Sequence, residues 1–249
     1  MKVETIKATS GKWFQDQFNL KDLLTLSNAV NRINKGYIKK DQPIDNDDEG
    51  IAKNLPNLFI INNTLGIEKF KTKAIEKTLA KYYPAVDVID EDYENVEHMV
   101  RYFKGLSLKA IKRSISDFEQ TILGLIGKEY VDYKDVGILA SLPNVYANGQ
   151  KQKAFNKIEK ALAQGSEYVG TLHERGKFTV EFLHVKYIWR SQSYLFVAKD
   201  SNNNLIKFFS SQGGIKKGDT AEITGYVKDH TMGKQSKGPE TYLNRVKFA

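Results

Sequence analysis

The chain has 249 residues and carries 38 Lys and Arg against 30 Asp and Glu, which gives a formal net charge of +8. This basic balance favours an acidic partner, with nucleic acid ahead of an anionic membrane. The chain contains no cysteine, which excludes disulfides, thiolate catalysis, cysteine-ligated zinc and iron–sulfur clusters.

The first part of the chain predicts a helical region that begins after a polar stretch. Residues 1–12 are compatible with a short strand or a loose arm. Asn19 is a good N-cap for a helix whose apolar side chains recur on one side. These side chains are Leu20, Leu23, Leu24, Val30 and Ile33. The apolar run at 56–62 is too short to distinguish a strand from a buried helix.

Three further helices are expected before residue 126. Apolar residues at helical spacing occupy 67–79, and that helix must end before Pro84. A second apolar series, at 96–103, overlaps an acidic segment. Ser107 is expected to cap a single helix that continues through 108–125 with apolar residues three and four apart. A small strand pair completes the expected N-terminal region.

The stretch that follows the helical region predicts a domain boundary. An apolar run ends at Pro143, and Asn148 with Gly149 predicts a turn. Residues 150–165 then have the pattern of a lysine-rich helix that ends at Gly165.

The last part of the chain predicts a small barrel. Five strand-like runs are separated by turns rich in Asn, Gly and Lys, at 178–189, 194–199, 205–210, 221–229 and 242–248. The fourth run alternates cleanly, with Ala221, Ile223, Gly225 and Val227 on its apolar face. A long first strand followed by four shorter ones matches an OB-like barrel in strand number and size.

The basic excess belongs to the second half of the chain. Residues 126–249 hold 19 Lys and Arg against 12 Asp and Glu, whereas residues 1–125 hold 19 against 18. The sequence therefore predicts an α+β protein in three parts. These are a mainly helical domain at 1–149, a basic connecting helix at 150–165 and a five-stranded OB-like β-barrel at 166–249.

The C-terminal third resembles a module found in phage-encoded proteins that bind single-stranded nucleic acid. The resemblance depends on an ordered set of short segments. They are Val169-Gly170-Thr171, Arg175, Lys199-Asp200, Asn204-Leu205, Phe208-Phe209-Ser210, Lys228-Asp229-His230 and ETYLNRVK at 240–247. It implies binding of single-stranded DNA in replication or recombination, and it does not extend to residues 1–150.

Binding of a single strand without sequence preference needs aromatic faces for base stacking and cations along the phosphates. The candidate residues come from the strands and from the glycine-rich loop at 229–239. They are Arg175, Lys186, Tyr187, Trp189, Arg190, Tyr194, Lys207, Phe209, Tyr226, Lys228, His230, Lys234, Lys237 and Arg245. Because a small barrel must also fill its interior, about half of the aromatic side chains are expected to point inward.

The expected function is non-enzymatic binding of single-stranded nucleic acid, above all DNA, by a phage accessory protein of replication or recombination. Its expected partners are the strand itself and replication or phage assembly proteins, with no cofactor, metal or membrane. The first alternative is a structural component of a phage assembly that uses the barrel as a docking module. The second is a metal-dependent nuclease that uses the acidic residues of 87–97. No leader or membrane span is visible, so we expect a cytoplasmic protein, in the host cell if phage-encoded.

Overall fold

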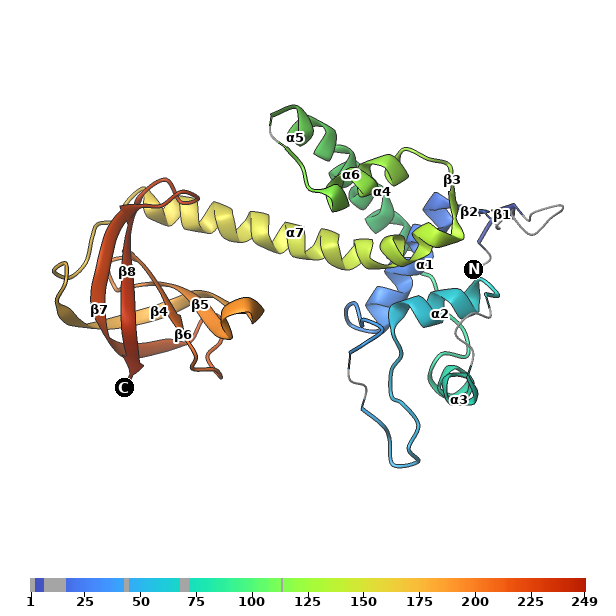
Figure 1. The fold of residues 1–249 in the computed structure, drawn as a ribbon, viewed down its shortest axis with the longest axis horizontal. Helices are drawn as coiled ribbons and strands as arrows, with labels where there is room; N and C mark the ends of the chain where they lie inside the picture. The colour runs from blue at the N-terminus through green and yellow to red at the C-terminus, as the bar shows by residue number, and fades with distance from the viewer. Residues whose placement is uncertain (1–2, 7–16, 43–44, 68–71, 113) are drawn as a thin grey trace. The chain divides into compact units, whose positions relative to one another are not determined.

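The computed structural model describes residues 3–6, 17–42, 45–67, 72–112 and 114–249. The chain divides into two compact units, Met1–Gly149 and Gln150–Ala249, and the long helix α7 (Val136–Ala163) crosses the boundary (Figure 1). The architecture is α+β, with helices in the first unit and a closed barrel in the second. Among the described residues, no helix is both long enough and apolar enough to cross a bilayer.

The first unit is built around helix α1 (Leu20–Ile33), which begins where the sequence predicts. The Asn19 side chain accepts hydrogen bonds from the backbone nitrogens of Lys21 and Asp22, at 3.0 and 3.2 Å. Helices α2 (Asn57–Thr64) and α4 (Asp90–Lys104) pack on α1, and α3 (Lys73–Tyr82) follows α2. The apolar run at 56–62 is thus helical. Fully buried side chains of α1, α2 and α4 form the core of this unit.

A short antiparallel sheet joins the two ends of the first unit. Its strands are β1 (Thr5–Ile6), β2 (Gln17–Asn19) and β3 (Tyr130–Asp132), in that order. The expected arm or strand at 1–12 falls mostly outside the described residues. The central strand β2 leads directly into α1, so the sheet fixes where that helix starts.

A buried carboxylate ties α4 to α1. Asp92 is 1% exposed and accepts hydrogen bonds from Nε and Nη2 of Arg32, at 3.2 and 2.9 Å. It also accepts from the backbone nitrogen of Ile89 at 3.1 Å, which satisfies a free donor at the start of α4. This one member of the acidic segment therefore has a structural role.

The single helix predicted over 108–125 is wrong, because the structure forms two helices there. These are α5 (Leu106–Lys112) and α6 (Asp117–Ile126). A capping box starts α6: the Ser116 hydroxyl accepts from the backbone nitrogen of Glu119, and the Glu119 carboxylate accepts from that of Ser116. Ser107 instead donates its hydroxyl hydrogen to the carbonyl of Lys104. The break leaves apolar side chains of α5 in solvent.

The turn predicted at Asn148 and Gly149 is also wrong, because both residues lie inside α7. Gly149 is explained by packing: a Cβ there would lie 2.3 Å from the hydroxyl oxygen of Tyr102. Pro143 lies in the same helix, where it removes one backbone donor. Buried neighbours such as Leu139 and Leu142 keep this stretch helical through core packing.

The second unit confirms the predicted five-stranded OB-like barrel. The strands are β4 (Arg175–Ile188), β5 (Ser193–Lys199), β6 (Leu205–Ser210), β7 (Thr220–Met232) and β8 (Pro239–Phe248). They close in the order β4-β5-β6-β8-β7, and β6 with β8 forms the parallel pair. Alternate side chains of all five strands fill the interior, among them Phe182, Phe196, Phe208, Ile223 and Leu243. Gly225 allows close packing, because a Cβ there would lie 3.1 Å from the Leu243 side chain.

The chain between α7 and β4 closes one end of the barrel. The Ser166 hydroxyl donates to the carbonyl of Pro239 and accepts from the backbone nitrogen of Leu205, both at 2.9 Å. The end of α7 touches the start of β8 so closely that Gly238 has no space for a side chain. A Cβ at Gly238 would lie 2.2 Å from the carbonyl oxygen of Ala163.

We therefore expect Gly238→Ala to lower the free energy of unfolding of the second unit by about 1–3 kcal/mol, because backbone must shift to admit the methyl group. Gly165→Ala is the matched control: nothing lies within 4 Å of a Cβ there. Urea unfolding monitored by circular dichroism measures both. Equal midpoints for the two variants would contradict the close approach of α7 to β8.

Candidate nucleic-acid interface

The outer face of β5 and β6 forms the floor of a groove. Because Phe196 and Phe208 point into the core, their neighbours Leu195, Lys207 and Phe209 point outward. The part of α7 that belongs to the second unit supplies one wall, through Gln152, Phe155, Asn156 and Glu159. The groove has a volume of about 460 Å³ and also includes His184, Lys186 and Tyr242.

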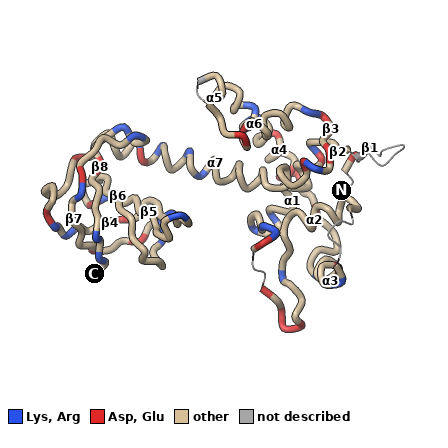
Figure 2. The backbone as a smooth tube through the Cα atoms, viewed as in Figure 1, with Lys and Arg blue, Asp and Glu red and all other residues tan. Residues whose placement is uncertain are grey.

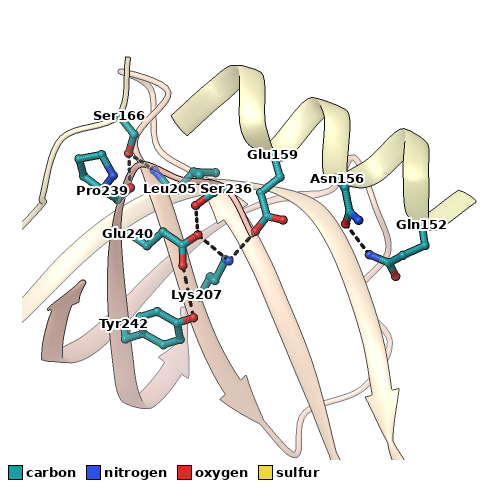
Figure 3. Close-up of polar contacts among 10 residues, drawn as sticks. All are labelled: Gln152, Asn156, Glu159, Ser166, Leu205, Lys207, Ser236, Pro239, Glu240 and Tyr242. Carbon is teal, nitrogen blue, oxygen red and sulfur yellow. Dashed lines mark hydrogen bonds and ion pairs between the residues drawn. The ribbon is translucent and has the colours of Figure 1, made fainter. Parts of the chain in front are cut away.

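A buried ionic cluster fixes this wall to the barrel. The Lys207 ammonium pairs with the carboxylate of Glu159 on α7 and with Oε1 of Glu240 on β8, the latter at 2.8 Å (Figure 3). The three side chains are only 10%, 3% and 1% exposed. The Ser236 hydroxyl donates to Glu240 Oε1, and the Tyr242 hydroxyl donates to Oε2 at 3.3 Å. The cluster thus joins α7, β6, β8 and the β7–β8 loop.

The charge balance of this cluster makes Lys207 indispensable to it. Burial lowers the pKa of Lys207, but hydrogen bonds to Glu159 and Glu240 outweigh that effect, so its pKa lies above the ordinary value. The ammonium therefore stays charged at neutral pH. Without it, two carboxylates would remain in a buried site with no counter-charge.

His184 adds an aromatic contact between β4 and α7. Its ring stacks on Phe155 with centroids 4.3 Å apart and planes 27° apart. Burial lowers the pKa of His184; Lys186 and Lys217 act in the same direction, and Glu159 opposes them. The imidazole is therefore neutral at pH 7 and forms part of the wall of the groove.

A second hollow adjoins the first along the β7–β8 loop. It has a volume of about 490 Å³ and shares Lys207, Gln235 and Tyr242 with the groove. Lys228 and Lys234 line it, and both are exposed. The two hollows together give a path along the outside of the barrel, and exposed Lys186, Lys228, Lys234 and Asp229 line it.

Two aromatic residues are presented to solvent at the end of the barrel where β6 finishes. Trp189, in the β4–β5 turn, is 83% exposed, and Phe209 is 53% exposed. Trp189 meets the ring of Tyr187 edge to face, with centroids 4.9 Å apart. Tyr187 in turn meets Tyr194, which also packs on the barrel core. Trp189 and Phe209 are therefore the aromatic faces most open to a ligand.

The predicted cations differ in where the structure places them. Lys and Arg are spread over the strands and loops of the second unit (Figure 2). Exposed cations are Arg175, Lys186, Arg190, Lys228, Lys234, Lys237 and Arg245. Of these seven cations, Lys186, Lys228 and Lys234 line the two hollows. Lys207 is buried and paired, so we leave it out of the proposed interface.

The remaining predicted residues, Tyr226 and His230, lie on β7 and contact the segment before β4. Tyr226 is half-buried, and its ring centroid lies 6.2 Å from that of His173. His230 stacks on Tyr168 at 4.7 Å, and its Nε2 lies 3.2 Å from the carbonyl oxygen of Val169. These contacts give both residues a structural role, whatever else they bind.

Sequence reasoning missed the residues that α7 brings to the groove. Gln152 and Asn156 lie one turn apart, and Gln152 Nε2 donates to Asn156 Oδ1 at 2.8 Å (Figure 3). Phe155 lies in the stretch predicted as a lysine-rich helix, but nothing in the sequence indicates its partner on β4, His184. Tyr242 and Gln235 were likewise not among the expected site residues.

The acidic segment at 87–97 does not form a metal centre in the structure. Asp92 pairs with Arg32, and Glu97 accepts a hydrogen bond from Lys21 at 2.7 Å. Within the described ranges, no three His, Asp or Glu side chains gather as metal ligands.

Comparisons with known proteins give no relative for this chain. No family model matches it, and neither a curated protein nor a solved structure matches it. Function must therefore be argued from the site itself.

We expect Lys207→Met to lower the free energy of unfolding of the second unit by roughly 3–5 kcal/mol, because Glu159 and Glu240 would be left buried and unpaired. Lys186→Met is the control, since Lys186 is exposed, and it should change stability by no more than about 0.5 kcal/mol. Urea unfolding at pH 7 measures the free energy of unfolding of both variants. If both variants unfolded alike, Lys207 would not be the anchor of α7.

Proposed function

We propose that the second unit binds single-stranded nucleic acid along the outer face of its barrel, without enzymatic activity. One observation carries the proposal: two adjoining hollows on that face are lined by exposed Lys186, Lys228 and Lys234 and by the exposed ring of Phe209. OB-like barrels use the outer face of their second and third strands, here β5 and β6, for oligonucleotides.

The mechanism combines two interactions that do not depend on base sequence. Bases would stack on Phe209 and Trp189, and each such stack contributes about 1–3 kcal/mol. The lysines would neutralise phosphates and release counterions, so affinity would fall as salt rises.

The resemblance of the C-terminal third to a phage module supports a more specific proposal. It favours single-stranded DNA as the ligand and an accessory role in phage replication or recombination, in the cytoplasm of the host cell. The residues of that resemblance extend from the segment before β4 to β8. They include Phe209 and Lys228, which line the proposed path.

A second candidate is a protein-docking module in a phage assembly. One observation favours it: the outer face of the barrel already holds helix α7, through the Phe155–His184 stack and the Glu159–Lys207 pair. A groove that accepts one helix could accept a partner's helix or strand beside it. No grouping of the described residues favours the nuclease alternative.

The binding proposal is tested by the triple variant Lys186→Gln, Lys228→Gln and Lys234→Gln. With three fewer phosphate contacts, the slope of log affinity against log salt should become less negative by about 2 for a single strand. Fluorescence anisotropy with a labelled oligonucleotide between about 50 and 200 mM salt gives the slope.

The matched control is Lys53→Gln, Lys73→Gln and Lys77→Gln, which removes the same charge from exposed positions of the first unit. Its slope should equal that of the unchanged protein. Salt-independent binding by the unchanged protein would defeat the proposal, and so would equal losses in the two triple variants. A docking module would keep its protein partner after the first triple substitution.

A further inference from the structure

The exposed side of helix α7 in the second unit carries positive charge and no negative charge. The acidic residue of 150–164 is Glu159, which is buried and paired with Lys207. Four cations of this stretch are exposed, and the structure describes every residue of it. They are Lys151, Lys153, Lys157 and Lys160. A helix side with several cations and no acid attracts a polyanion.

Three of these cations form a lysine row (Lys153, Lys157 and Lys160) beside the groove. They are four and three residues apart, so they follow one side of the helix. Asn156 lines the groove. Lys160 comes four residues after Asn156 and therefore lies next to it, one turn further along. The lysine row thus runs along the side of α7 that adjoins the groove wall.

The groove wall itself presents amides. Gln152 and Asn156 both line the groove, and Figure 3 shows them on the side of α7 that faces the strands. Gln152 Nε2 donates to Asn156 Oδ1 at 2.8 Å, which fixes the two amides relative to each other. This bond leaves Gln152 Oε1 as an acceptor and the hydrogens of Asn156 Nδ2 as donors. The edges of bases carry donors and acceptors side by side, and Asn and Gln side chains pair with them.

The rest of the groove also suits a base better than a phosphate. Of its charged lining residues, Glu159 and Lys207 pair with each other, which leaves Lys186 as the exposed one. The 53% exposed ring of Phe209 gives a face on which a base can stack. A phosphate offers acceptors alone, so it cannot use the acceptor that Gln152 presents.

We propose that α7 forms one side of the nucleic-acid interface and orients the strand. Bases point into the groove toward Gln152 and Asn156, and phosphates lie along the lysine row. This inference rests on the proposed function and specifies how the strand lies in that site. An anionic membrane fits less well, because a helix that lies on a membrane needs a broad apolar side. Within the fully described stretch 150–164, Ile158 is the one large apolar side chain that is exposed.

The phosphate contacts are tested by the double variant Lys157→Gln and Lys160→Gln. With two fewer phosphate contacts, the slope of log affinity against log salt should become less negative by about 1.4 for a single strand. Lys177→Gln with Lys247→Gln is the matched control, because both lysines are exposed and lie outside the two hollows. The control should keep the slope of the unchanged protein. Fluorescence anisotropy with an oligothymidylate measures all three.

The base contacts are tested by Gln152→Met with Asn156→Leu, which removes both amides and nearly keeps the side-chain volumes. Two probes are compared: the oligothymidylate and an abasic oligomer of equal length, which has the same phosphates and no bases. The amide variant should bind the oligothymidylate about tenfold more weakly, with the salt slope unchanged, and should bind the abasic oligomer as the unchanged protein does. The lysine variant should lose slope on both probes. Circular dichroism verifies the fold of each variant.

The outcomes separate this inference from the proposed function. If the unchanged protein bound with a steep salt dependence but the lysine variant kept its slope, or the amide variant weakened both probes equally, the orientation on α7 would be wrong and the proposed function would stand. A lysine variant that kept its slope and lost binding to phosphatidylserine vesicles would assign the row to a membrane and also overturn the inference. Salt-independent binding by the unchanged protein would overturn both.

Discussion

The pairing of one buried lysine with two buried glutamates holds helix α7 against the barrel of the second unit. Lys207 lies on β6, Glu159 on α7 and Glu240 on β8, and Ser236 adds the loop between β7 and β8. Burying three charges is costly unless all are paired, so these elements must come together or not at all. The groove on the outer face of the barrel exists because α7 is held beside the strands.

This arrangement divides the basic residues of the barrel between structure and binding. Lys207 is buried in the ionic cluster with Glu159 and Glu240. Lys186, Lys228 and Lys234 are exposed to solvent along the two hollows. Trp189 and Phe209 add exposed rings at one end.

The sequence predicted the barrel well, because alternation along a strand is a local property. Ala221, Ile223, Gly225 and Val227 repeat every second residue, and the other strands end at recognisable turns. The sequence did not reveal features that depend on contacts between residues far apart in the chain. Gly149 suggests a turn, but it lies inside α7, where the Tyr102 side chain leaves no space for a Cβ. The burial of Lys207 was invisible because Glu159 and Glu240 are 48 and 33 residues away in the chain. The helix break before Ser116 could have been predicted from its capping box with Glu119.

The central claim is that a single strand lies along the outer face of the barrel, and photo-crosslinking tests it most directly. An oligonucleotide with 5-iodouracil at successive positions would be irradiated with the protein, and the attached peptides identified by mass spectrometry. We predict crosslinks at Trp189 and Phe209, because their exposed rings are where bases can stack. Crosslinks confined to the first unit, or none above those of an unrelated basic protein, would contradict the account.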